Sequence, residues 1–206
     1  MNNEKQTLSK WSAEGIDWFA LACKTYEERR VALVFQKLCD IERNECYFAF
    51  VPTKDRAHTK EASGMRRIPW LNGYVFIATT ERVEHCTKMV DSLKANDEAI
   101  FKLLSYDGSK ASPLTEADKL LFVAILDEDF HIPALKADVV NGRVVIAQNA
   151  IEANGGKITK VDRRKQSALV EMDVMNKPMK YEVALEFPQA EDVQRLKKQA
   201  GGHKDV

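Results

Sequence analysis

Two runs of strict alternation near the C-terminal end constrain the fold most. Apolar residues stand at every second position from Ala168 to Val174, and again from Met179 to Leu185. Successive side chains of a β-strand point to opposite faces, so a period of two indicates strands with one buried face. Asn176 to Pro178, between the runs, is typical of a turn. The pattern predicts a hairpin, and with strands at 143–146 and 156–161 we expect it to be part of a small five-strand barrel.

The N-terminal half predicts an antiparallel sheet with helices packed against it. Trp18 to Cys23 is apolar at every position, as in a strand covered on both faces. Thr25 and Glu28 have the spacing of a capping box, which predicts a helix from about Tyr26 to Glu42. Further expected elements are a strand at Cys46–Val51, a strand, bend and strand within Met65–Thr80, a helix after Thr80, a strand at Ile100–Leu104 and a helix after Pro113. This order is the split βαβ arrangement, so the fold class expected is α+β.

The sequence divides into two folded parts. We expect a disordered tail at 1–15, a first domain at 16–126, a linker at 127–138, the barrel domain at 139–188 and a charged tail at 189–206. The linker prediction rests on Pro133, on acidic residues and on the lack of a clear period. We expect a monomer.

Composition narrows the classes of function. Lys plus Arg and Asp plus Glu both number 31, so any nucleic-acid contact must come from local patches. The four cysteines include no C-x-x-C pair, which favours reduced, buried thiols over disulfides or a metal site. No signal peptide, apolar span of about 18 residues or catalytic motif is recognisable. The sequence therefore predicts a cytoplasmic protein that is not an enzyme and has no cofactor.

Two segments resemble a known family. Trp70 to Phe76 reads WLNGYVF and resembles the F-P-G-Y-V-F signature in the amino-terminal domain of the NusG family of transcription elongation factors. Trp18 to Leu21 is similar to the W-Y-x-L that opens that domain. The segment Asn141 to Asp173, with Gly155-Gly156 near its middle, resembles the KOW motif of the second domain. We expect Gly156 to provide a positive φ for the turn. The family's proline is replaced by Asn72.

The resemblance implies contacts with bacterial RNA polymerase. In the family, the amino-terminal domain binds the polymerase clamp helices through an apolar concavity that includes the aromatic residues of the signature. By position these are Tyr74 and Phe76, and Trp70 is a plausible addition. His85 and Thr87 fall where the RfaH paralogue contacts the opposite side of the cleft, although a solvated helical histidine is the better interpretation of His85.

The resemblance also implies contacts with nucleic acid. Lys24, Arg29 and Arg30 could meet the non-template DNA strand, and a solvated helix start is the alternative. Lys54, Arg56, Arg66 and Arg67 form a second basic group. In the barrel, a third group suits an RNA hairpin, or else this domain docks a ribosomal protein or Rho. The third group consists of Lys157, Lys160, Arg163, Arg164 and Lys165.

The function expected is that of a specialised NusG-type factor of the LoaP or RfaH type. It would bind RNA polymerase and modulate elongation by processive antitermination at particular operons. The alternative is an RNA-binding KOW module that acts in translation or on the ribosome. Such modules are usually strongly basic, so the zero net charge argues against it. The regular alternation predicts a stable barrel rather than one that refolds.

Overall fold

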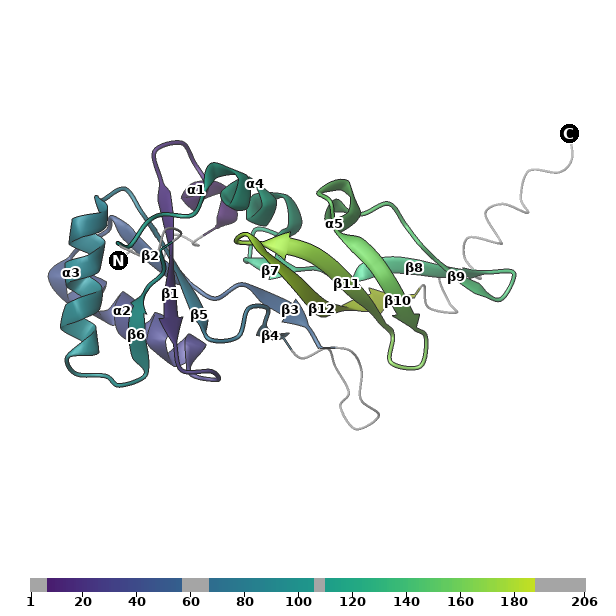
Figure 1. The fold of residues 1–206 in the computed structure, drawn as a ribbon, viewed down its shortest axis with the longest axis horizontal. Coiled ribbons are helices and arrows are strands. Elements are labelled where there is room, and N and C mark those ends of the chain that lie inside the picture. The colour runs from purple at the N-terminus through teal and green to yellow at the C-terminus, as the bar shows by residue number, and fades with distance from the viewer. Residues whose placement is uncertain (1–6, 57–66, 106–109, 188–206) are drawn as a thin grey trace, which may run out of the picture.

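The N-terminal half is built on a four-stranded antiparallel sheet. The computed structural model describes residues 7–56, 67–105 and 110–187. The sheet has the order β2-β5-β1-β6, and it lies at one end of the molecule with the barrel strands at the other (Figure 1). Its elements are β1 (Asp17–Cys23), α2 (Glu28–Glu42), β2 (Tyr47–Phe50), β5 (Tyr74–Thr79), α3 (Val83–Lys94) and β6 (Ile100–Leu103). The split βαβ prediction is confirmed.

Both faces of this sheet are buried. Phe19 and Leu21 of β1 lie in the core beneath α2 and α3, whereas Trp18 and Ala20 lie in a second core on the opposite face. That second face packs against α4 (Glu116–Ile125), and the short α1 (Leu8–Trp11) lies beside it. The prediction that β1 is covered on both faces is confirmed, because its alternate residues belong to two separate cores.

The start of α2 differs from the prediction. The helix begins at Glu28 and its N-cap residue, Glu27, makes no side-chain cap hydrogen bond. The Glu28 carboxylate is buried and accepts hydrogen bonds from the backbone N–H groups of Tyr26, at 3.1 Å, and Gly73, at 2.6 Å. The capping-box prediction is therefore wrong, because the Glu28 carboxylate binds the backbone N–H groups of two separate turns and does not cap the helix.

A small three-stranded sheet connects the two halves of the chain. Its order is β4-β3-β7, from β4 (Arg67–Pro69), β3 (Thr53–Asp55) and β7 (His131–Ile132). His131 is buried, with Nδ1 3.0 Å from Thr53 Oγ1 and Nε2 3.3 Å from Asp55 Oδ2. The segment predicted to be a linker thus contains β7 and the start of the next strand. A two-residue strand has no period that a sequence could reveal.

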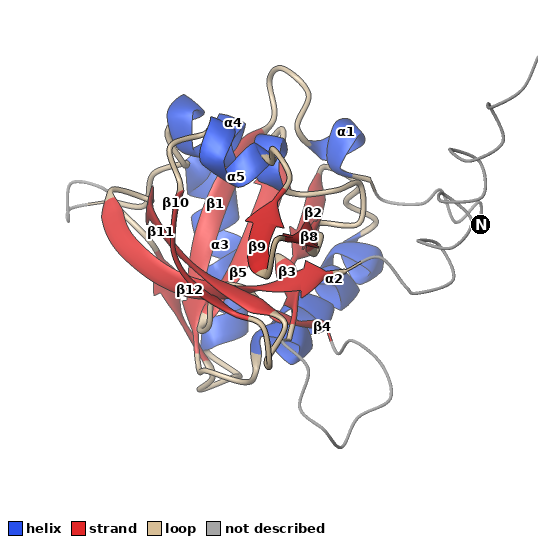
Figure 2. Cartoon of the chain, turned by 90° about the vertical axis from the view of Figure 1, so that its right-hand side faces the viewer, coloured by secondary structure: helices blue, strands red, loops and turns tan. Residues whose placement is uncertain are grey.

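The C-terminal half is a nearly closed five-strand barrel (Figure 2), as predicted. Its order is β10-β11-β12-β8-β9. The strands are β8 (Leu135–Val140), β9 (Arg143–Ile146), β10 (Lys157–Asp162), β11 (Ser167–Val174) and β12 (Lys177–Glu186), with α5 (Ala150–Ala153) between β9 and β10.

Two turns of the barrel differ from their predictions. The hairpin turn is formed by Met175 and Asn176, both at positive φ, and Pro178 lies within β12 opposite Asp173. Gly155 has the positive φ that we expected at Gly156. At Gly156 the reason for glycine is space, because a Cβ there would lie 2.4 Å from Ile151 Cγ2.

The two halves share one apolar core. Buried residues of β1, β5 and α4 belong to the same cluster as Val170, Val183 and Leu185 of the barrel. Asp118 of α4 accepts a 2.9 Å hydrogen bond from the N–H of Met175 through its carboxylate. None of the helices in the described ranges is long and apolar enough to span a membrane.

Candidate functional site

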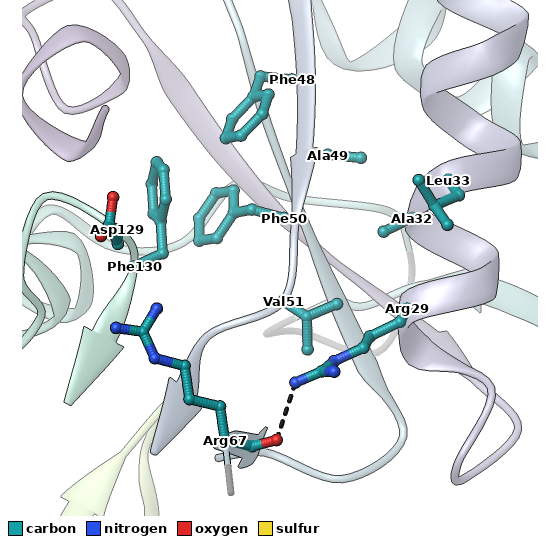
Figure 3. A pocket seen from close by; sticks show the side chains of 10 residues that line it. All are labelled: Arg29, Ala32, Leu33, Phe48, Ala49, Phe50, Val51, Arg67, Asp129 and Phe130. Carbon is teal, nitrogen blue, oxygen red and sulfur yellow. Dashed lines mark hydrogen bonds between the residues drawn. The ribbon is translucent and has the colours of Figure 1, made fainter. Parts of the chain in front are cut away.

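An open groove of about 630 Å³ follows strand β2, between helix α2 and the residues before β7 (Figure 3). Because β2 is the edge strand of its sheet, side chains from both of its faces line the groove. Phe48 and Phe50 line one side, and Ala49 and Val51 line the other. The remaining lining residues are Arg29, Ala32, Leu33, Arg67, Asp129 and Phe130.

Three phenylalanine rings form the apolar wall of the groove. Phe130 lies 4.3 Å from Phe50 and 5.3 Å from Phe48, measured between ring centroids. Trp11 stacks on Phe48 at 5.4 Å, and Phe50 contacts Phe76 at 5.8 Å. The wall is therefore supported from behind by the core, which keeps the rings in place before any partner arrives.

The opposite wall combines an exposed leucine with two arginines. Leu33 of α2 is 63% exposed. Arg29 donates a 2.9 Å hydrogen bond from Nη2 to the backbone carbonyl of Arg67, and the Arg67 guanidinium extends toward Phe130 (Figure 3). A groove with an apolar wall and with arginines at one end suits a partner that carries apolar side chains and a carboxylate.

The aromatic residues of the sequence signature occupy other positions. Phe76 is fully buried, with its ring 5.0 Å from Phe122, and Trp70 is 4% exposed. Tyr74 is half-buried on the same face as Phe76, as alternation predicts. Trp70 and Phe76 thus belong to the core and are not surface contacts in this structure. The residues that sequence reasoning missed are Phe48, Phe50 and Phe130; alternation in β2 pairs the first two, but no local pattern marks Phe130.

The part of the chain that contains this sheet matches a known protein family. Residues 16–120, which are 105 of the chain's 206 residues, match the family model described as Transcription termination factor nusG. The chain belongs to the NusG family. We call residues 16–120 the NusG domain; it contains α2, β2 and β4 of the groove, whereas Phe130 and the barrel lie beyond the matched range.

One solved structure of a NusG protein shares the fold of this chain. The structure titled "Domain interaction in Thermotoga maritima NusG" has a TM-score of 0.52 at 13% identity, and the match covers 82% of this chain and 93% of that chain. The "MjSpt4:Spt5 complex conformation A" structure has a TM-score of 0.29 at 12% identity, covering 81% and 91%. The likeness to the Thermotoga maritima protein shows the shared fold. The curated proteins contain no match.

His85 and Thr87 lie on α3 of the NusG domain, across the sheet from α4. His85 is exposed and its Nδ1 lies 2.8 Å from the Glu81 carboxylate. Thr87 donates from Oγ1 to the Val83 carbonyl at 2.8 Å, and it lines a second open pocket with Lys88 and Lys110. The two residues therefore lie apart from the groove, on a separate surface.

The predicted cations of the NusG domain are not equivalent. Lys24 is exposed, whereas Arg30 forms hydrogen bonds of 2.6 and 3.0 Å with Asp97 and a further one with Glu27. These hydrogen bonds, first that to Asp97, raise the pKa of Arg30, and the same contact lowers the pKa of Asp97. Arg29 and Arg67 belong to the groove. Arg66 lies outside the described residues.

Lys54 lies in β3 of the small sheet, and Arg56 comes directly after that strand. Lys54 donates to the backbone carbonyl of Glu182 and lies over the Tyr181 ring, and its burial lowers its pKa. It therefore contacts the barrel, while Arg56 is exposed. The members of this basic group therefore lie in different places. Lys54 contacts the barrel, Arg67 lines the groove and Arg56 is exposed on the surface.

The cations of the barrel remain together on its surface. Lys157 and Lys160 are exposed on β10, and Arg163, Arg164 and Lys165 are exposed in the turn that follows. Asp162 organises this turn by accepting hydrogen bonds of 3.0 Å from the N–H groups of Arg164 and Lys165. These backbone hydrogen bonds, first that from Lys165, lower the pKa of Asp162.

Proposed function

We propose that this NusG-family chain binds bacterial RNA polymerase and modulates elongation, by processive antitermination at particular operons. Membership of the family supports the transcriptional role. The specialised LoaP or RfaH type rests on the sequence resemblance, including the ending Val183-Ala184-Leu185-Glu186. The nascent RNA or the exposed non-template strand would be its second partner.

The observation that carries polymerase binding is the open aromatic groove on the NusG domain. Buried aromatic anchors commonly dominate protein interfaces. The groove is lined by three aromatic rings on the sheet face that carries the signature residues. We infer that the half-buried Phe48 contacts the clamp helices directly and that Phe50 and Phe130, each 5% exposed, support it. Phe76 would act by supporting Phe50 from below, since their centroids lie 5.8 Å apart. Trp70 would support the same core through Phe122, and Tyr74 would extend the surface beyond it.

The test is a pull-down of bacterial RNA polymerase core enzyme. Wild type would be compared with Leu33→Ser and Phe48→Ala in the groove and with Leu120→Ser as a matched control. Leu120 is 59% exposed on α4, against 63% for Leu33 on α2, so we expect the two leucine substitutions to affect folding to a similar extent. Loss of an aromatic anchor costs roughly 2 kcal/mol of binding or more.

We expect the control to bind as wild type does and both groove variants to bind far less. Equal binding by all four proteins would exclude the groove as the docking surface. If wild type itself does not bind the core enzyme, the transcriptional proposal fails. A terminator read-through assay with the binding-competent proteins then separates antitermination from other effects on elongation.

One observation favours the alternative function in translation. Five exposed cations gather on β10 and its turn, which is a surface suited to RNA phosphates. The same chain can be tested for sedimentation with ribosomes and for binding to ribosomal RNA. Binding there without any binding to polymerase would favour the translation-side module.

We propose that the barrel contacts nascent RNA, with a ribosomal protein or Rho as the competing partners.

A further inference from the structure

Residues 7–15 precede the matched range 16–120, and they pack against the aromatic wall of the groove. Leu8 and Trp11 of α1 are 4% and 5% exposed, and both belong to the core that the NusG domain shares with the barrel. Trp11 stacks on Phe48 with 5.4 Å between the ring centroids and 19° between the ring planes. Helix α1 therefore contacts the ring that we expect to meet the clamp helices.

The N-terminal end of α1 is attached to the turn that carries Phe130. The N–H of Leu8 donates to the backbone carbonyl of Glu128 at 3.2 Å. The carboxylate of Glu128 accepts hydrogen bonds from the N–H and the hydroxyl of Ser9, at 3.1 and 2.9 Å. Since Phe48 and Phe130 come from different segments, α1 connects the two segments whose rings meet in the apolar wall.

The turn at Phe130 has a strained conformation that its neighbours maintain. Phe130 has a φ of 56°, which is unfavourable for a residue with a bulky side chain. Its N–H donates to the carbonyl of Asp127 at 2.9 Å, and its carbonyl accepts from the N–H of Thr53 at 3.0 Å. Strain of this kind persists only where the surrounding structure determines the conformation. The attachment of α1 to Glu128 is one of the contacts that do so.

Further hydrogen bonds fix the segment that follows α1. Trp18 donates from Nε1 to the carbonyl of Trp11 at 2.7 Å. Lys119, which is 8% exposed, donates from Nζ to the carbonyls of Ala13 and Ile16, at 3.3 and 2.8 Å. Lysine is rarely buried to this extent unless its ammonium group is paired. A helix of four residues is not stable on its own, so these tertiary contacts determine where α1 lies.

We propose that α1 is a positioning element for the groove. Trp11 fixes the orientation in which the Phe48 ring meets the clamp helices, and Glu128 holds α1 against the turn of Phe130. The inference rests on the proposed function, because it makes α1 responsible for keeping the polymerase-binding wall in order. It goes further in giving a role to two residues, Trp11 and Glu128, that lie outside the matched range and do not line the groove.

Fluorine NMR tests the positioning without polymerase. The full chain is labelled with 4-fluorophenylalanine, and the signal of position 48 is assigned by its loss in Phe48→Leu. A stacked indole shifts the resonance of the neighbouring ring, because its ring current changes the local magnetic field. We expect Trp11→Ala and Glu128→Ala to move this signal. Glu128→Gln is the matched control, because its amide oxygen can still accept from Ser9, and it should leave the signal in place.

Titration with bacterial RNA polymerase core enzyme tests the consequence for binding. We expect Trp11→Ala to weaken binding by about fivefold or more, a size usual for residues in direct contact. Trp11→Phe keeps a ring on Phe48 and should bind nearly as wild type does. In a Phe48→Leu background, Trp11→Ala should have almost no further effect, because two residues that act through one contact are not additive. A general loss of stability would weaken binding by the same factor in both backgrounds.

Three results would overturn the inference. A signal of position 48 that Trp11→Ala leaves unchanged would show that the indole does not fix the ring. Wild-type binding by Trp11→Ala would exclude an effect on the partner, and an equal loss in both backgrounds would assign Trp11 to stability alone. If wild type itself does not bind the core enzyme, the proposed function fails, and the NMR comparison alone decides whether Trp11 positions the ring. The two failures are therefore distinguishable.

Discussion

The rings of Trp70 and Tyr181 meet edge to face, with their centroids 5.3 Å apart. Trp70 follows β4 in the NusG domain and Tyr181 lies in β12, so the contact joins the two halves of the chain. Both side chains are buried. The indole Nε1 of Trp70 has no hydrogen-bond partner within the described residues, which makes Trp70 a large apolar contact with one unsatisfied donor.

Substitution of Trp70 should separate packing from the unsatisfied donor. We expect Trp70→Ala to lower the free energy of unfolding by about 3–5 kcal/mol, as is usual for buried Trp. Trp70→Phe removes the unpaired N–H together with part of the ring, so its cost should be less than half of that. Urea unfolding followed by circular dichroism measures both. Equal losses for the two variants would contradict the role given to packing.

Asp118 connects the start of α4 to the barrel hairpin. Its Oδ2 accepts from Thr115 Oγ1 at 2.6 Å, and its Oδ1 accepts from the N–H of Met175. Asp118→Ala leaves that partly buried N–H unpaired, so we expect a loss of about 1–3 kcal/mol. Thr115→Ala removes the N-cap hydrogen bond from Asp118 N and the hydroxyl's hydrogen bond to Asp118 Oδ2, but it leaves the bond from Met175 in place and should cost about 1 kcal/mol. A larger loss for Thr115→Ala would contradict this ranking in the same unfolding experiment.

The glycine pair before β10 should respond to alanine for two different reasons. At Gly156 the new Cβ would lie 2.4 Å from Ile151 Cγ2 and 2.9 Å from the Ile151 carbonyl oxygen. Crowding of this kind typically costs about 1–3 kcal/mol. Gly155 has open space around it but a φ of 85°, so Gly155→Ala should cost about 1–2 kcal/mol from backbone strain. Asn at position 155 tolerates that φ and should restore most of the loss, whereas Asn at position 156 should not.

Buried thiols should make the protein less stable at alkaline pH. Burial raises the pKa of Cys23 to about 11 and the pKa values of Cys39 and Cys86 to about 12, from an ordinary value of 9.0. A raised pKa favours the protonated thiol in the folded state, so this stabilisation is complete below pH 9 and is lost between pH 9 and about 12. Burial lowers the pKa of Lys54, so this one residue makes a contribution of opposite sign, which favours the folded state as the pH rises.

Urea unfolding at about pH 8 and about pH 10.5 tests this dependence. The free energy of unfolding should fall with increasing pH, and a Cys86→Ala variant should show a smaller fall. Thiol labelling offers a second measurement, because Cys46 is half-buried and should react before the three buried cysteines. A free energy of unfolding that rises with pH over this range would contradict the stabilising role given to the buried thiols.

Several features of the structure depend on contacts between segments that lie far apart in the sequence. Glu28 has the spacing of a capping residue, yet it binds Gly73, 45 residues away in the chain. Trp70 and Phe76 carry the family signature, yet α4 and the barrel cover them. The segment predicted to be a linker contains β7, whose partner Thr53 lies 78 residues earlier in the chain than His131. In each case the deciding contact comes from a distant segment, which no local pattern contains.

The sequence by itself predicted the main strands and helices of both halves and the family. Period-two alternation specified β11 and β12, because a shift of one residue would expose every apolar side chain of a strand. Uninterrupted apolar character specified β1, and the two motifs predicted the NusG domain and the barrel. Only the tertiary structure decided which aromatic residues line the groove. Phe48, Phe50 and Phe130 come from segments some 80 residues apart and form one wall only after the chain has folded, whereas Phe76 on the same sheet does not line it.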